Sequence, residues 1–373
     1  MQTTPRTSDT PEHQKKPRKK PSLLLITVIL GTIGLIGQLL WVNWPKPTAE
    51  SEPLATELNE VIDRLPGTSD ALIYLGLEDI RQSGFWQEAL PDSIKQMNWL
   101  QFDTTLTALA RENGFRPAQD IDTLLVQFQH RNSTTQDFLG IVWGDFPDGF
   151  DMQALEKRGR QATTIAGQRC AGLRDDLWIC RPSERMVLLG SSSGILSRYL
   201  QKSSSFLERD STTAALIGKA AYKSHLWFTL SSTNWTIGAL QSLTSANKDL
   251  QTLGNLNRIR QLVLSLKLDD GIEGQSEWIY ENRRSAYFAS TFLWSALKLS
   301  STPGTRTPPQ IKQLLDNIDV MQNLESVMIT ADLPPELFSR NPDPASSSGT
   351  PGPAGAETEE RRADAKPRSA PTP

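Results

Sequence analysis

One segment of the chain carries a spacing used in nucleophilic catalysis. Gly190 to Gly194 has the sequence Gly-Ser-Ser-Ser-Gly, which matches the Gly-x-Ser-x-Gly pattern of a nucleophile elbow. The segment lies between a predicted strand and a predicted helix, as an elbow requires. With Ser192 as the nucleophile, Asp210 would be the acid and His225 the base, because His225 is the only histidine downstream.

The interval between these residues favours a structural role instead. The stretch from Ser192 to His225 is too short to hold the strands and helices that normally bring such partners together. Serines before a helix cap its first turn, and glycines permit the tight turn that leads into it. We therefore predict no catalytic residue here, and a serine hydrolase stays as the alternative.

The two cysteines, Cys170 and Cys180, are spaced for a structural bridge. If the residues between them form a hairpin centred on Asp175, the two side chains lie directly opposite each other, at a separation that a disulfide spans. An oxidising compartment preserves such a bond. The spacing is not that of a redox or metal motif, and no histidine lies nearby. We predict a disulfide, with two free thiols as the alternative.

Neither a metal nor a cofactor is predicted. Asp120-Ile-Asp122 invites comparison with the acidic pair of metal-dependent glycosyltransferases, but that pair follows a buried strand, and here the strand comes after it. Turn and capping roles are therefore favoured for both aspartates. His130 has no acidic or cysteine partner at ligand spacing. No glycine-rich phosphate loop is present.

The elements that position these residues predict an α+β fold with antiparallel pairing. Short apolar runs bounded by turns indicate strands, and apolar residues three and four apart indicate helices. Strands are expected at 71–77, 123–129, 138–143, 186–189, 225–230, 262–268 and 326–331, and helices at 54–65, 106–110, 151–160, 237–253, 289–297 and 311–318, with one more ending near 200. The elements fall into two related halves of sheet plus helices, 69–203 and 204–340.

One hairpin is specified down to its register. The leucines at 262, 264, 266 and 268 share one face of a strand. A three-residue loop with Gly271 in the left-handed position places Leu262 opposite Trp278, whereas a two-residue loop would place the leucines opposite polar residues. The longer loop is predicted because it buries more apolar surface. The helix at 289–297, with Phe292, is expected to pack on this leucine face.

A membrane anchor is predicted ahead of this domain. Ser22 to Val42 contains no charged residue and has the length, about 20 residues, that a helix needs to cross a bilayer. Trp41 and Trp44 suit an interfacial position at its outer end. The run is longer than a signal peptide requires, lacks a small-x-small cleavage site and is followed by no lipoprotein cysteine.

The charges on either side of this run predict its orientation. Five basic residues come directly before it, and the following segment turns acidic. Because positive charge is retained in the cytoplasm, the N-terminus is expected inside and the domain outside. The predicted order is a basic cytosolic tail (1–21), a transmembrane helix (22–44) and a stem (45–68).

Composition limits the partners. The chain of 373 residues has a net charge of −3, with basic charge concentrated in the cytosolic tail, so nucleic-acid binding is not expected. Residues 341–373 are rich in Pro, Ala and Ser and are predicted to be disordered. The expected partners are the lipid bilayer and an envelope protein.

A loose set of motifs resembles a group of uncharacterised exported bacterial proteins, found mainly in acidobacteria and similar envelope-rich lineages. The motifs are Gly114-Phe115, Pro117, Asp120-Ile121-Asp122, a strand, and Trp143-Gly144-Asp145-Phe146 before a helix. The similarity spans roughly residues 70–300. It implies a single-pass α+β protein with a repeated architecture outside the cytoplasmic membrane, and it brings no activity.

Together these patterns predict a non-enzymatic protein of the cell envelope. It would be anchored in the cytoplasmic membrane by one helix and act as a scaffold, a partner-binding module or a sensing module on the extracytoplasmic side. The membrane-anchored hydrolase with Ser192 and His225 is the alternative.

Overall fold

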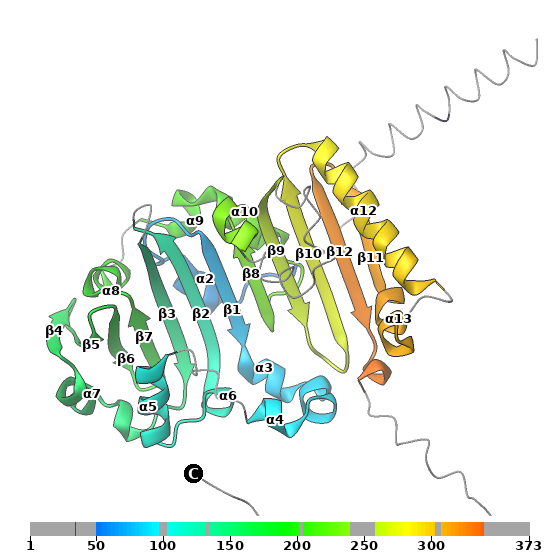
Figure 1. The fold of residues 1–373 in the computed structure, drawn as a ribbon. Coiled ribbons are helices and arrows are strands. Elements are labelled where there is room, and N and C mark those ends of the chain that lie inside the picture. The colour runs from blue at the N-terminus through cyan, green and yellow to red at the C-terminus, as the bar shows by residue number, and fades with distance from the viewer. Residues whose placement is uncertain are drawn as a thin grey trace, which may run out of the picture. The chain divides into compact units, whose positions relative to one another are not determined.

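The computed structural model describes residues 50–96, 103–131, 135–201, 204–238, 258–302 and 307–338, together with Gly34 (Figure 1). The predicted anchor, apart from Gly34, and the predicted tail at 341–373 lie outside the described residues. Most of the predicted helix at 237–253 does too. Within the described ranges, no helix is both long and apolar enough to cross a membrane. The predicted domain boundaries stay predictions.

The fold is α+β and is built on one twelve-stranded antiparallel sheet, which confirms the predicted fold class. Its strand order is β11-β12-β10-β9-β8-β1-β2-β3-β7-β6-β5-β4. The strands are β1 (Ala71–Gly76), β2 (Ile121–His130), β3 (Gln136–Gly144), β4 (Gln161–Ile165), β5 (Gln168–Arg174), β6 (Leu177–Ser183), β7 (Met186–Gly190), β8 (Leu226–Leu230), β9 (Ile259–Lys267), β10 (Ile272–Tyr280), β11 (Ile318–Asn323) and β12 (Ser326–Leu333).

The sheet consists of two sets of strands that meet at a seam between β1 and β8. The seam runs from the pair Ala71–Leu230 to the pair Leu75–Leu226. Outward from it, the two sets follow the same order: a first strand, a hairpin (β2-β3 or β9-β10), then the last strand of the set (β7 or β12) and the strand before that (β6 or β11). The first set continues with β5 and β4.

Helices cover the sheet from both sides (Figure 1). They are α2 (Thr56–Ile62), α3 (Leu77–Gln82), α4 (Asp92–Lys95), α5 (Thr104–Glu112), α6 (Pro117–Asp120), α7 (Met152–Arg158), α8 (Ser193–Leu200), α9 (Phe206–Arg209), α10 (Ser211–Lys219), α12 (Arg283–Ser301) and α13 (Pro309–Asp316). A π-helical turn (Phe85–Ala89) and 3-10 turns (Asp148–Phe150, Pro335–Leu337) complete the list.

The two faces of the sheet carry separate cores. On one, which we call the groove face, Tyr74 and Ile141 pack with side chains of α2, α8, α9 and α10. On the other, which we call the α12 face, Val142 and Ile179 pack under α3, α5 and α7 in the first set of strands. Over the second set, α12 covers β10, β11 and β12 on that same face.

Helix starts follow the capping rules on which the sequence argument relied. Asp151, the first residue of the helix predicted at 151–160, caps α7 by accepting a hydrogen bond from the Gln153 amide at 3.1 Å. Asn282 caps α12 by accepting from the Ser285 amide at 3.0 Å. Each cap satisfies an amide that the first turn of a helix leaves without an intrahelical partner.

The predicted hairpin register is confirmed, because Leu262 lies opposite Trp278. Three other expectations were wrong. The strands β4 and β11 were not predicted, and Ile318, assigned to a helix, begins β11. The leucine face packs with Phe228 and the half-buried Trp235 rather than with α12. Phe292, expected in the core, is 45% exposed.

Candidate binding groove

A groove of about 620 Å³ lies on the groove face, between α2, α8 and the sheet. Tyr74 and Trp143, from β1 and β3, and Met186 from β7 contribute its strand-borne lining. Its helical lining comes from α2 and α8, with Leu58, Val61, Tyr199 and Leu200. The volume is within the range of small-ligand sites, and most of these side chains are apolar or aromatic, as in such sites generally.

The helix α2 is held in place by apolar contacts on one side. Leu58 and Ile62, four residues apart, are 8% and 0% exposed and belong to the core of the groove face. Glu57 and Glu60 on the same helix are exposed and line the groove. One short helix therefore supplies both the packing that fixes it and the polar groups that a ligand would meet.

The segment before α2 is also tied to the domain. The Glu52 amide donates to the Ala221 carbonyl at 2.8 Å, and the Lys223 amide donates to Glu52 Oε2 at 2.7 Å. The Lys223 ammonium group lies 2.6 Å from the Glu52 carbonyl oxygen. Because 45–68 is the predicted stem, these bonds hold its part around Glu52 against the segment that leads from α10 into β8.

Two tyrosines with neutral hydroxyls are among the residues that line the groove. The Tyr74 ring stacks on Trp227 with 5.5 Å between centroids, which fixes its orientation. Burial, with a smaller contribution from Asp79, raises the Tyr74 pKa, and burial raises the pKa of Tyr199 to about 12. Both phenols are therefore protonated at neutral pH and can donate hydrogen bonds.

The rim of the groove is charged and mostly acidic. Asp122 is held by Arg81 at 2.8 Å and by Arg185 at 2.6 Å. The carboxylates of Glu57, Glu60 and Glu78 add to Asp122, whereas Arg64 and Arg185 are the basic residues of the lining. A ligand with an apolar group and a positive charge complements this surface.

The residues of the hypothetical triad each have a structural role. Ser192 caps α8, its Oγ accepting from the Ile195 amide at 3.4 Å. Asp210 caps α10 and accepts from the Ser69 amide at 2.8 Å. His225 Nδ1 accepts from the Leu268 amide at 2.7 Å.

The strand order keeps these residues apart. Ser192 follows the end of β7 and His225 precedes β8, with β3, β2 and β1 between those strands. At about 4.8 Å per strand, this order alone separates them by about 19 Å. The register adds to the distance, because Gly190 aligns through β3, β2 and β1 with Thr229, near the far end of β8. The three side chains do not form a triad in this structure.

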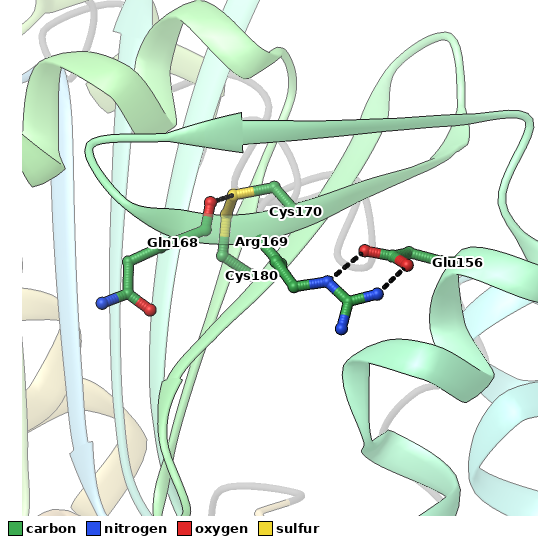
Figure 2. Close-up of a disulfide and its surroundings, with 5 residues drawn as sticks. All are labelled: Glu156, Gln168, Arg169, Cys170 and Cys180. Atoms are coloured by element: carbon green, nitrogen blue, oxygen red, sulfur yellow. Dashed lines mark hydrogen bonds and ion pairs between the residues drawn. A yellow bond between two sulfur atoms is a disulfide. The ribbon is translucent and has the colours of Figure 1, made fainter.

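The predicted disulfide is confirmed. Cys170 and Cys180 lie opposite each other on β5 and β6, with 4.3 Å between their Cα atoms, and the sulfur atoms are bonded (Figure 2). Both residues are fully buried in the core of the groove face. Arg169, the residue before Cys170, donates two hydrogen bonds to the Glu156 carboxylate on α7 (Figure 2). Disulfides persist in oxidising compartments, so this one points to an extracytoplasmic domain.

The remaining candidate ligands are engaged in pairs. Asp120 Oδ2 accepts from the Arg116 amide at 2.6 Å, and Asp122 bridges the two arginines of the rim. His130 Nδ1 lies 2.5 Å from Asp70 Oδ2, a pairing the sequence argument missed because Asp70 is distant in the chain. Among the residues that the structure describes, no group of His, Cys, Asp and Glu is arranged to hold a metal ion.

The groove residues were not found from the sequence. Tyr74 and Trp143 lie on the strands predicted at 71–77 and 138–143, where the sequence pattern does not set them apart from core residues. Their place in the groove depends on where α2 packs, and α2 lies far from β3 in the chain. No local signal distinguishes such an aromatic residue from a core residue.

The comparisons with known proteins give a distant similarity of fold. No protein-family model matches the chain, and no curated protein does. Among solved structures, crystal form I of the Treponema protein TP0453 is similar with a TM-score of 0.39 and 13% identity, over 74% of this chain and 94% of that one. Crystal form IV of the same protein is similar with a TM-score of 0.40 and 10% identity, over the same shares of the two chains. No activity follows from this similarity.

Proposed function

We propose that this chain is a non-enzymatic binding module of the cell envelope, anchored in the cytoplasmic membrane by residues 22–44, with its domain on the extracytoplasmic side. The groove between α2 and the sheet is its binding site. The ligand is an extended segment of an envelope protein that carries an apolar side chain next to a basic one.

The composition of the groove carries this proposal. Its lining combines aromatic side chains with two phenol donors, and its rim has more carboxylates than basic groups. Aromatic anchors in a concave site supply binding energy, while rim charges govern the rate of association and the choice of partner.

A binding role agrees with the structural use of the residues that could do chemistry. Two of them cap helices, Ser192 at α8 and Asp210 at α10. His225 accepts a hydrogen bond from the Leu268 amide, near the end of β9. Glu52, in the predicted stem, bonds Ala221 of the domain, which supports a groove that lies near the membrane. A module in this position suits a scaffold that holds partners at the membrane surface.

Photocrosslinking in cells tests the proposal. A benzophenone amino acid replaces Glu60 or Arg185 in the full-length chain, at two sides of the groove. The expected result is the same envelope protein crosslinked from both positions. The matched control carries the benzophenone at Gln153, an exposed position on α7 on the other face of the sheet.

A second variant ties the adduct to the groove chemistry. Replacing Trp143 with Ala removes the largest lining side chain, and it is expected to reduce the adduct at least about tenfold, as loss of an aromatic anchor does. Adducts of equal yield from Gln153, or an adduct that the Trp143→Ala variant leaves unchanged, would overturn the proposal.

A further inference from the structure

The helix α12 packs on the sheet through its small residues. Ser285, Ala286, Ala289 and Ser290 are buried, and the helix lies against β10, β11 and β12. Small side chains on the inner side allow a close approach to the strands, so little apolar surface of this helix is used in the core. Of its large side chains, Leu293 packs against the core, whereas Tyr287, Phe288, Phe292, Trp294 and Leu299 are exposed.

The outer side of α12 and the neighbouring α13 carry an exposed apolar strip, which we call the aromatic ridge. Its members are Tyr287 (36% exposed), Phe288 (47%), Phe292 (45%), Trp294 (52%), Leu299 (69%) and Ile311 on α13 (43%). At 100° per residue, Phe288, Phe292 and Leu299 fall within one narrow sector of the helix. Tyr287 and Trp294 fall in a second sector, about 100° or more away on the same outer half. Large apolar side chains that gather in an exposed position on one half of a helix mark an interaction site.

The same segment is strongly basic. From 283 to 315 the sequence has no Asp or Glu, although the chain as a whole has a net charge of −3. Its basic residues are Arg283, Arg284, Lys298, Arg306 and Lys312. The Arg284 guanidinium lies over the Phe288 ring, 5.7 Å from its centroid, so charge and apolar surface are adjacent.

These charges decide between two possible occupants. A second copy of the chain placed symmetrically on the ridge would bring the two basic segments together, which is unfavourable. An anionic bilayer offers negative headgroups for the basic residues and an apolar boundary for the aromatic ones. Tryptophan and tyrosine are enriched at that boundary.

We propose that the aromatic ridge docks on the surface of an anionic lipid bilayer, with α12 lying in the headgroup region. The outer half of the helix has the composition of an interfacial helix, with two groups of exposed apolar side chains and the basic residues Arg284 and Lys298 between them. Docking fixes the orientation of the domain on the membrane. This inference rests on α12 and α13 alone and does not depend on the groove.

Depth-dependent quenching in vesicles tests the docking. The full-length chain is reconstituted into phosphatidylcholine vesicles with and without phosphatidylglycerol. An environment-sensitive fluorophore is attached to a Leu299→Cys variant, and Gln153→Cys serves as the control label; the native cysteines are bridged and do not react. Doxyl lipids are expected to quench the Leu299 label in anionic vesicles, and not the Gln153 label.

Two variants separate charge from apolar contact. Replacing Arg284 with Gln is expected to shift the equilibrium away from the docked state about fivefold, since each basic residue contributes about 1 kcal/mol at an anionic surface. The Arg284→Lys variant keeps the charge and should dock normally. A double Phe292→Ser, Trp294→Ser variant should lose the quenching while keeping the circular dichroism of the folded chain.

Three outcomes overturn the proposal. They are equal quenching with and without phosphatidylglycerol, equal quenching of the two labels, and disulfide-linked dimers through position 299 that form in place of quenching. The last would identify a second copy as the occupant. Crosslinking from Glu60 tests the groove separately, so the docking proposal can fail while the groove proposal holds, and the reverse.

Discussion

The two sets of strands follow the same order from the seam outward, yet they bury their faces differently. Strands β1 to β7 have a large core on each face, one beneath α2 and α8 and one beneath α5 and α7. Strands β9 to β12 rely on smaller clusters, one of them under α12. The helices, more than the strands, therefore determine what each part of the surface offers to a partner.

This difference has energetic consequences. Local stability increases with buried apolar contact, so the first set of strands should be the more resistant to opening. The seam belongs to both sets, and a defect there should weaken the whole sheet. The following predictions test this ranking.

The largest loss is expected at the seam. Trp227 on β8 is fully buried and stacks on Tyr74 of β1. Replacing Trp227 with Ala should lower the free energy of unfolding by about 3–5 kcal/mol, the cost of removing a large buried side chain. Urea unfolding of the full-length chain in detergent measures it. The Trp227→Phe control keeps most of the packing and should lose clearly less; equal losses would contradict a packing origin.

A smaller loss, confined to the first set, should follow removal of the disulfide. The double variant Cys170→Ala, Cys180→Ala releases a short closed loop, for which a loss of about 2–3 kcal/mol is expected. Hydrogen exchange followed by mass spectrometry should show faster exchange in β5 and β6, with β10 and β12 unchanged. Faster exchange across all twelve strands would show that the two sets do not open separately.

In the second set, the small residues under α12 are the sensitive ones. Ala289 is 3% exposed against the sheet, so an Ala289→Leu substitution overfills the contact and should cost about 1–3 kcal/mol. Exchange should accelerate in α12 and β12. The matched control Ala296→Leu adds the same bulk at a half-buried position on the same helix, and it should cost less.

A pH dependence is expected from His225 at one end of the seam. Burial lowers its pKa below the ordinary value of 6.5, against the opposing effects of Asp269 and Asp79. The unfolded chain then binds a proton more readily, so stability is complete above about pH 6.5 and falls as the pH decreases below it. Protonation would also remove the acceptor for the Leu268 amide.

Replacing His225 with Gln removes this titration. Urea midpoints measured between pH 7.5 and pH 5 should fall less steeply for the variant than for the natural chain, if both share every other titrating group. Identical slopes would show that His225 does not contribute to the dependence.

The smallest effect is expected on the outer side of α12. Phe292 is 45% exposed, so Phe292→Ser should change the free energy of unfolding by no more than about 0.5 kcal/mol in either direction. Thermal unfolding of the two proteins in detergent compares them. A loss above about 2 kcal/mol would place Phe292 in a packed contact and remove the basis for a ridge.

The sequence by itself determined the features that depend on neighbours in the chain. The bridge between Cys170 and Cys180 and the opposition of Leu262 and Trp278 followed from hairpin geometry, because period-two alternation and loop length fix which residues face each other. The cap at Asp151 and the α+β class had the same local origin. The anchor and the tail stay predictions.

Only the tertiary structure decided the features that depend on distant segments. The strand β11 has no clear alternation of its own and forms by pairing with β12, which is why Ile318 looked helical. The groove exists because α2 and the strands β1, β3 and β7, which are distant in the chain, line the same space. Phe292 is exposed because alanines and serines occupy the inner side of α12. The periodicity of apolar residues shows that a helix has an apolar side, but only the tertiary packing decides which side of the helix is buried.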